Sequence, residues 1–406
     1  MDPITHGITG ALIGKGFFSR RHARVAIFAA TLGAIFPDVD IFMGAFSNDP
    51  LRLARYHRGF THSFLGLLPL AAVLAWLTRL ALKWFTKSKS SADLGSPSFG
   101  ALFLIYTAGI GSHILLDATT SFGTRLWNPL SGDRVAWDFL FIIDFTFTSL
   151  VLLPQVTAWI YKEARGWLIR AAAMWALFTV LAFGVCLLAR AADFSFSPRI
   201  VVISSLIFAA LFFLPARNGF GIRFGRTHWC RAGFCVACSY ILICGFAHRA
   251  ALARVRSFAS SHRLAVEKLG ALPLPPSLLE WNGLIETPGG VYQSEFSLLD
   301  SAVPAFRFLA NSPANLFTEK AARLKPVRTY LWFARFPVMR FMQSGDTNIV
   351  EYADPRFFAG ASQETIPFSF EVRFDSRGNA IDFGWIHGGL RFPRARVAPD
   401  SSDTSP

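Results

Sequence analysis

The feature that most constrains this chain is a series of apolar stretches, each about as long as a membrane-spanning helix. Such a helix needs roughly 20 largely apolar residues. Seven candidates precede residue 248: Arg24–Phe42, Phe60–Lys83, Phe99–Asp117, Trp137–Tyr161, Trp167–Arg190, Arg199–Pro215 and Trp229–Ala247. A shorter stretch, Ile4–Phe18, comes first and predicts a tilted or partly inserted helix. Residues 1–247 are therefore predicted to form an all-α polytopic membrane domain of about seven spans plus a short N-terminal helix.

The basic residues predict the orientation of these spans. Four clusters would fall on one side of a seven-span chain: Arg20, Arg21 and Arg24; Lys83, Lys87 and Lys89; Lys162 and Arg165; Arg217, Arg223 and Arg226. Loops rich in lysine and arginine stay in the cytoplasm, so the opposite loops and everything after residue 248 are predicted to be periplasmic. Three arginines in the loop 43–59 depart from this rule. Because orientation accounts for many of the charges behind the net +14, no nucleic-acid partner is expected.

After residue 248 the composition changes to more charges and several prolines, with no apolar run of membrane length. Residues 248–396 are predicted to form a small α+β or β-rich periplasmic domain, followed by a disordered tail at 397–406. An amphipathic helix is expected at Arg249–Leu269. Strands are expected at Gly290–Phe296, Thr329–Phe336, Phe368–Phe374 and Ala380–Trp385.

Seven ionisable residues stand where the spans meet the outer face. Such residues at membrane depth are costly and usually functional. The predicted topology brings four separate segments to the same side and depth, which predicts a shared site. Its members are His6, Asp38, Asp40, His57, His62, His113 and Asp117.

The residue types favour a metal centre. Imidazole nitrogen and carboxylate oxygen suit zinc, manganese or iron. His113 and Asp117 are four residues apart, so on a helix they share one face. Seven candidates exceed the three or four ligands of one catalytic zinc, which favours two or three metal ions. A site for one to three divalent ions is therefore predicted. Taken singly, the same residues are also compatible with helix-face pairs or interfacial side chains.

Three residues are predicted to take part in chemistry. Asp38 or Asp40 would accept a proton from metal-activated water. Arg58 lies between two histidines in sequence and would hold a phosphate or carboxylate with two hydrogen bonds. An interfacial arginine that meets lipid headgroups is the alternative for Arg58.

Four ordered motifs resemble the YdjM/YbcI-type inner-membrane metal-dependent hydrolases of bacteria. They are Met1-Asp-Pro-Ile-Thr-His6, Phe36-Pro-Asp38-Val-Asp40, His57-Arg58-Gly-Phe-Thr-His62-Ser, and His113…Asp117 with Thr120-Ser-Phe-Gly123. The resemblance covers about residues 1–150 closely. It implies a distant similarity to the zinc-dependent phospholipase C and single-strand nuclease group, and hence zinc and phosphodiester hydrolysis.

Together these observations predict a bacterial inner-membrane hydrolase with a periplasmic metal site. Its substrate would be a phosphoester of a lipid or lipid-linked molecule, because the site lies at headgroup depth. Two other function classes remain open: an ion-binding transporter, which intramembrane His and Asp also suit, and a non-catalytic membrane scaffold. The sequence leaves the oligomeric state open.

Overall fold

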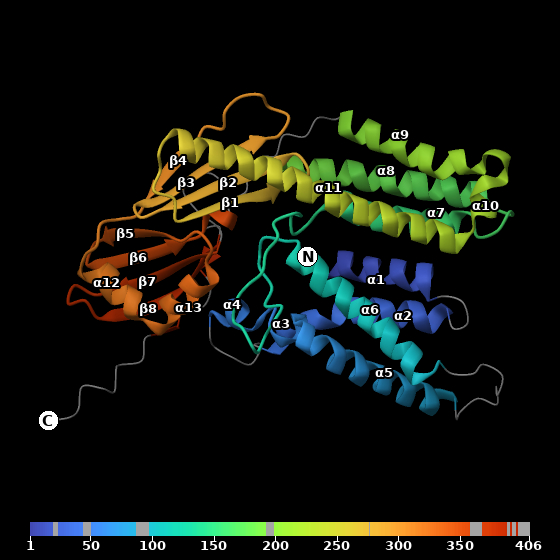
Figure 1. Ribbon diagram of the computed structural model, residues 1–406, viewed down its shortest axis with the longest axis horizontal. Coiled ribbons are helices and arrows are strands. Elements are labelled where there is room, and N and C mark those ends of the chain that lie inside the picture. The colour runs from blue at the N-terminus through green and yellow to red at the C-terminus, as the bar shows by residue number, and fades with distance from the viewer. Residues whose placement is uncertain are drawn as a thin grey trace.

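The computed structural model describes residues 1–18, 23–43, 50–86, 97–191, 199–275, 277–357, 368–387, 390–391 and 395–396. Its first half is helical (Figure 1). The longer helices before the sheets are α1 (Pro3–Phe17), α2 (Ala23–Ile35), α5 (Phe64–Thr86), α6 (Phe99–Ala118), α7 (Phe145–Ile160), α8 (Trp167–Ala191), α9 (Arg199–Phe213) and α11 (Arg226–Ser261). Short helical turns join them: η1 (Phe36–Val39), α3 (Asp40–Met43), α4 (Arg52–Tyr56), η2 (Phe60–His62), η3 (Leu214–Gly219) and α10 (Phe220–Phe224).

The helices α1, α2 and α6 pack closely because glycines stand at their contacts. A Cβ atom on Gly10 would lie 2.4 Å from the carbonyl oxygen of Ala30, and one on Gly109 would lie 2.6 Å from the same oxygen. Small residues let membrane helices approach this closely. The tight α1–α2–α6 contact places the N-terminus of α1 beside the last turn of α6, where the candidate site lies.

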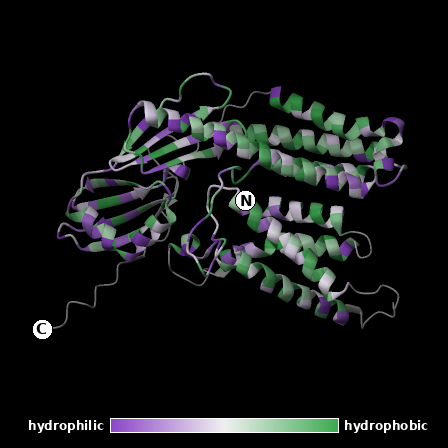
Figure 2. Ribbon diagram, in the orientation of Figure 1, coloured by the Kyte–Doolittle hydropathy of each residue, from purple (hydrophilic) through white to green (hydrophobic). Residues whose placement is uncertain are grey.

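Six helical segments among the described residues are long and apolar enough to cross a membrane. They are Ala23–Phe42, Phe64–Trp84, Phe99–Ala118, Trp167–Leu188, Arg199–Phe224 and Arg226–Ser261. Figure 2 shows apolar residues along these helices, as a lipid environment requires. Together with α1 and the shorter α7 they form a mostly helical, multi-pass architecture, but the expected count of seven spans is not confirmed.

The predicted span Trp137–Tyr161 is wrong in its extent. Residues 137–144 form a loop, and α7 begins only at Phe145, with Asp144 as its N-cap accepting a hydrogen bond from Phe147 N at 2.9 Å. The remaining 16 residues make a helix about 24 Å long, shorter than the ~30 Å hydrocarbon core. The Asp144 carboxylate caps the N-terminus of α7, so the helix begins at Phe145. Hydropathy alone predicts that it begins earlier, at Trp137.

The C-terminal part contains two antiparallel sheets (Figure 1). The first has the order β1-β2-β3-β4, formed by Lys268–Leu274, Glu280–Thr287, Gly290–Ser297 and Arg307–Ala310. The second has the order β10-β8-β7-β6-β5 with β9 beside β8, formed by Ala395–Arg396, Ala380–His387, Ser369–Phe374, Thr347–Ala353, Val338–Ser344 and Leu390–Arg391. Helices α12 (Leu316–Arg323) and α13 (Lys325–Phe333) and the turn η4 (Pro355–Phe357) complete this part.

Two expectations for the C-terminal part are wrong. The segment Thr329–Phe336 belongs mainly to α13, whose buried residues Val327, Tyr330 and Phe333 recur at helical spacing. The amphipathic helix expected at Arg249–Leu269 is the end of α11, which runs without a break to Ser261, and residues 268–269 begin β1. The other three expected strands correspond to β3, β7 and β8. The tail 397–406 lies outside the described residues.

Candidate metal centre

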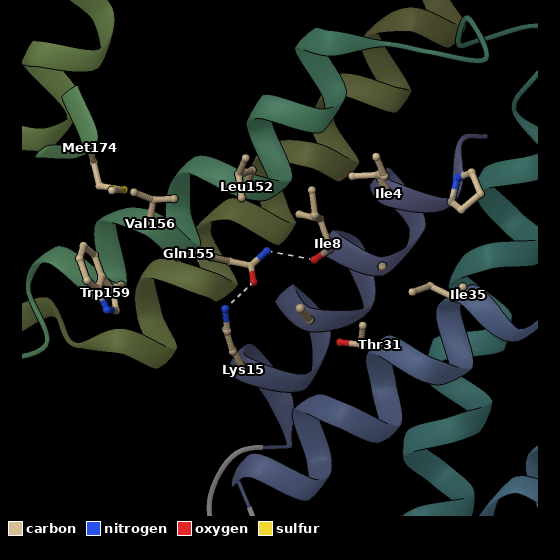
Figure 3. A pocket seen from close by; sticks show the side chains of 13 residues that line it. Ile4, Ile8, Lys15, Thr31, Ile35, Leu152, Gln155, Val156, Trp159 and Met174 are labelled. Carbon is tan, nitrogen blue, oxygen red and sulfur yellow. Dashed lines mark hydrogen bonds between the residues drawn. The ribbon is translucent and has the colours of Figure 1, made fainter. Parts of the chain in front are cut away.

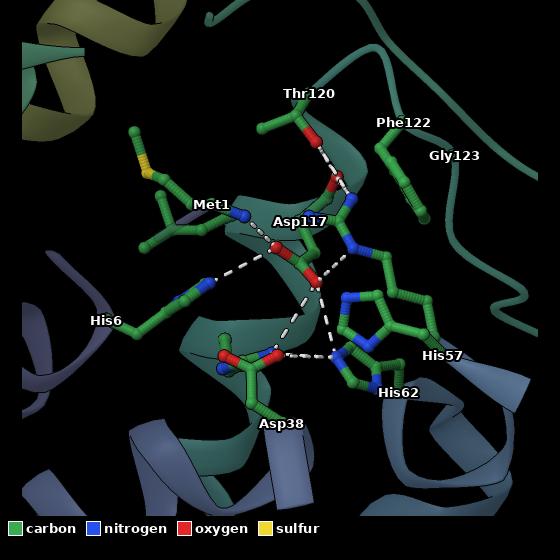
Figure 4. A network of polar contacts seen from close by, with 12 residues as sticks. Met1, His6, Asp38, His57, His62, Asp117, Thr120, Phe122 and Gly123 are labelled. Carbon is green, nitrogen blue, oxygen red and sulfur yellow. Dashed lines mark hydrogen bonds and ion pairs between the residues drawn. The ribbon is translucent and has the colours of Figure 1, made fainter. Parts of the chain in front are cut away.

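Four buried residues from three elements meet at one end of the helices (Figure 4). The last two turns of α6 carry His113 and Asp117 on one face, η1 carries Asp38, and η2 ends with His62. Pro37 begins the turn that ends α2 and directs Asp38 into the cluster. The side chains of His62 and His113 are fully buried, and those of Asp117 and Asp38 are nearly so.

The donor atoms of these four residues converge. One ligand atom from each lies within 4.8 Å of every other. His62 Nε2 is 2.9 Å from His113 Nε2, 3.4 Å from Asp38 Oδ1 and 3.3 Å from Asp117 Oδ2. Two imidazole nitrogens and two carboxylate oxygens form a donor set of the kind that binds zinc or a similar divalent ion. The chemistry of the donor set therefore fits a metal ion.

Both histidines are oriented by their second ring nitrogen. His113 Nδ1 lies 2.7 Å from the carbonyl oxygen of Ala34, which fixes the proton on Nδ1 and leaves the Nε2 lone pair facing the cluster. His62 Nδ1 lies 3.1 Å from Asp40 Oδ2. Histidine ligands of metal ions are held by such contacts to carbonyl or carboxylate oxygens.

A second group, formed by Asp40, His57 and His62, adjoins the first. Asp40 Oδ1 lies 2.8 Å from His57 Nδ1, and Asp40 Oδ2 accepts hydrogen bonds from Arg58 N at 3.0 Å and Thr61 Oγ1 at 2.8 Å. With the contact to His62, four groups surround this carboxylate, about as many as its lone-pair sites. The geometry therefore favours Asp40 as the residue that orients two histidines.

Asp117 is the most heavily contacted carboxylate of the cluster. Arg58 is buried beside it, with Nε 2.9 Å from Asp117 Oδ2 and Nη1 donating to Thr120 Oγ1 at 2.9 Å. His6 Nε2 lies 3.1 Å from Asp117 Oδ1, and its ring stacks on His113 with centroids 3.7 Å apart. The amino group of Met1 also contacts Asp117 (Figure 4). These contacts connect His6 and Arg58 to the four-residue group.

Two buried polar atoms of the cluster have unused capacity to bind a cation. Asp38 Oδ2 and His6 Nδ1 are buried and have no hydrogen-bond partner in the described part of the chain. Burial lowers the pKa of His62, but the hydrogen bonds that His62 can donate to the carboxylates of Asp117, Asp38 and Asp40 outweigh burial and raise the pKa to about 10. Three carboxylates around one imidazole thus favour a positive charge, which either a proton or a metal ion supplies.

All seven residues expected at the site lie in this connected cluster. In a comparison with known families, residues 1–193 match the model of the family described as YdjM inner membrane protein. This segment is YdjM-type. The resemblance inferred from the four motifs is confirmed, and the family together with the apolar helices indicates a multi-pass inner-membrane protein. No curated protein and no solved structure matches the chain.

The cluster lies wholly inside the YdjM-type segment, whereas the sheets follow it in sequence. Sequence reasoning missed the amino group of Met1 and the carbonyl of Ala34, because a backbone group carries no residue-type signal. It also missed Arg335 and Arg356, two residues of the C-terminal part that contact the loop after Asp117. Asp144 lies apart from the cluster, where it caps α7 and accepts a hydrogen bond from Tyr240 at 3.0 Å.

A separate apolar pocket of about 770 Å³ lies between α1, α2, α7 and α8 (Figure 3). Its α1 residues, among them Ile4, Ile8 and Ala11, share one face of the helix. Helical spacing places His6 on the opposite face, toward α6. Lys15 donates a hydrogen bond to Gln155 Oε1 at 2.8 Å within this pocket. The pocket and the candidate metal centre are therefore different features of α1.

Proposed function

We propose that this protein is a membrane-bound metal-dependent hydrolase acting on a phosphoester of a lipid or lipid-linked molecule. The observation that carries the proposal is the group Asp38, His62, His113 and Asp117, in which both histidines turn Nε2 toward two carboxylates. Zinc is the proposed ion because tetrahedral sites of nitrogen and oxygen donors suit it. A bound divalent ion supplies Lewis acidity and lowers the pKa of a coordinated water.

The residues of the chain have separable roles in this proposal. His62, His113 and Asp117 would hold the ion, with His6 as a further nitrogen donor beside Asp117. Asp38 would contribute Oδ1 to the ion, while its unpartnered Oδ2 can accept a proton from the attacking water. Asp40 is a weaker candidate for proton transfer because its oxygens already contact four groups.

Arg58 is proposed to position the substrate phosphate and to balance charge. Its Nε contacts Asp117 and its Nη1 donates to Thr120, so the guanidinium is fixed at the edge of the cluster. A guanidinium held in this way is pre-organised to bind an anionic oxygen. The same arrangement offsets the negative charge of Asp117 before the ion binds.

A lipid substrate is supported by the surroundings of the most exposed residues of the cluster. The side chains of Asp38 and His57 keep 11% and 12% of their surface exposed, whereas His62 and His113 keep none. The neighbouring segments expose large apolar side chains, with Phe42 at 70%, Tyr56 at 48% and Phe60 at 45%. Aromatic residues of this kind are enriched at membrane–water interfaces, so we propose that the site opens to the headgroup layer. We propose that this opening faces the periplasm, as the distribution of basic residues along the sequence predicts.

Metal content and turnover test the proposal together. Wild-type protein purified in detergent should hold zinc in a fixed stoichiometry by elemental mass spectrometry and should release product from a panel of phosphodiester lipids. The variant His113→Ala should lose both, while Cys235→Ala on an exposed face of α11 should keep both. Absence of metal from the wild type, or unchanged metal content in His113→Ala, would overturn the metal centre. Full metal content with no turnover would favour a binding protein.

A further inference from the structure

The C-terminal part of the chain contacts both loops that flank the candidate metal centre. The loop that leads to His57 and Arg58 inserts Leu51 into a hydrophobic core otherwise made by C-terminal residues, including Tyr330 and Phe370, and Leu51 is fully buried there. In the same region Trp385 Nε1 donates a hydrogen bond to the carbonyl oxygen of Pro50. The helix α4 that follows Leu51 therefore starts from a position fixed by the C-terminal part.

The second loop, which follows Asp117, is held by two arginines. Arg335 makes two hydrogen bonds to the carboxylate of Asp138, at 2.6 and 2.8 Å, and donates to the carbonyl oxygen of Ser121 at 3.3 Å. Arg356 donates to the carbonyl oxygen of Phe122 at 3.2 Å. Asp138 has a positive φ of 56°, a backbone conformation that needs support from its surroundings.

Phe122 connects these arginines to the site. Its ring lies edge-on to Phe333 of α13, with centroids 5.2 Å apart. The Arg58 guanidinium carbon lies 4.8 Å from the Phe122 ring centroid, and the His57 ring lies 5.6 Å from it. A continuous series of contacts thus runs from Arg335 through the Phe122 loop to Arg58 and on to Asp117.

We propose that Arg335 is a positioning residue for the metal centre, acting through Asp138 and Phe122 on Arg58 and His57. The C-terminal part is then a structural component of the site, although it lies outside the matched segment 1–193. Only one part of this inference rests on the proposed function, namely the expected effect of Arg335 on metal affinity. The coupling of the two loops is a property of the chain itself and can be measured without metal.

The test compares Arg335→Gln and Asp138→Asn, which remove the same ion pair from either side, in the detergent-solubilised full-length chain. Hydrogen–deuterium exchange of the metal-free protein should show lost protection in both 50–62 and 119–124 in either variant. Zinc affinity should fall about 10-fold, the lower end of the range for a direct outer contact of a metal ligand, because Arg335 acts on the ligands through intermediate residues. The double variant should lose no more than Arg335→Gln alone, because the ion pair with Asp138 is already broken in that variant. Arg335→Lys should recover part of the affinity.

Arg328→Gln is the matched control, because Arg328 is exposed on α13 of the same part of the chain. It should leave exchange and zinc affinity unchanged. If Arg335→Gln fails to fold, Phe122→Leu tests the same series of contacts from within the YdjM-type segment. Lost protection confined to 119–124, or wild-type zinc affinity in a folded Arg335→Gln protein, would overturn the proposal. A wild-type protein that binds no zinc would refute the proposed function, while the exchange data would still decide the coupling.

Discussion

The role of Asp40 gives the sharpest test of the site geometry. Asp40 contacts His57 Nδ1, His62 Nδ1, Arg58 N and Thr61 Oγ1 at distances of 2.8 to 3.1 Å. In Asp40→Asn one oxygen becomes an NH2 group, which cannot accept these hydrogen bonds. Whichever oxygen is replaced, the negative charge that both imidazoles face is lost. The proton on His62 Nδ1 is then held less strongly and can move to Nε2, the nitrogen that faces the cluster.

The expected magnitude follows from this role as an orienting residue. Loss of an orienting contact to a metal ligand costs about 10- to 100-fold in affinity, which corresponds to about 1.4 to 2.7 kcal/mol. The number of bound ions should stay the same. Loss of a ligand should instead reduce the stoichiometry, so His113→Ala provides the comparison.

Calorimetric titration of metal-free protein with zinc, supported by elemental mass spectrometry, measures both quantities. Asp133→Asn is the control, because Asp133 lies in an exposed loop and accepts a hydrogen bond from Ser131. If Asp40→Asn loses a full equivalent of metal, Asp40 is a ligand. If its affinity equals that of wild type, the contacts of Asp40 do not control the orientation of His62. Either result would refute this account of the site.

Three further predictions concern the fold and its pH dependence. Leu51→Ala should destabilise the protein by about 2 to 5 kcal/mol, measured by chemical unfolding, because a fully buried leucine leaves a cavity where the site loop enters the C-terminal core. Gly10→Val should lower the thermal unfolding temperature and the metal content together, since its Cβ would lie 2.4 Å from Ala30 O, whereas Gly184→Val, where a Cβ meets nothing within 4 Å, should not. The pKa of His62 is raised from 6.5 to about 10, so its stabilising contribution is complete below pH 6.5 and is lost as pH rises toward 10. Metal-free wild type should therefore unfold at lower temperature at pH 9.5 than at pH 7, and His62→Gln should show a smaller difference.

The residues of the site could be predicted from sequence because ionisable side chains are costly, and therefore rare, in membrane-spanning helices. His113 and Asp117 stand out in an apolar helix, and their spacing already places them on one face. Their partners Asp38 and His62 could be placed at the same end of the helices from topology alone. The different role of Asp40 could not, because it depends on which oxygen meets which ring nitrogen after η1 and η2 have folded.

Two features could not be predicted from the sequence: where the helix of the fourth apolar stretch begins, and which C-terminal residues hold the loops of the site. Both depend on contacts between residues that are far apart in the chain. Hydropathy cannot separate an apolar loop from a helix, so Phe139 and Leu140 were assigned to a span although they lie in a loop. The segment around Tyr330 alternates as a strand does, yet it packs as a helix against Phe370. Arg335 and Asp138 are 197 residues apart, and only the folded chain brings them together.

The helix α11 joins the membrane part and the sheets as one rigid element. Its 36 residues extend about 54 Å, far more than the ~30 Å of hydrocarbon that a span must cross. Its distal residues Ala251, Val255 and Ala259 pack with Trp281 and Ile285 of the first sheet, so the helix and that sheet share a core. Because α11 is one continuous helix, a tilt of its membrane part also moves its distal end. A thicker or thinner bilayer changes the tilt of a spanning helix. We expect a change in the tilt of α11 to move its far end together with the first sheet. Other residues of the C-terminal part contact Leu51 and Asp138, so the loops of the site would move with it. We therefore expect metal affinity to depend on the thickness of the bilayer that holds the protein.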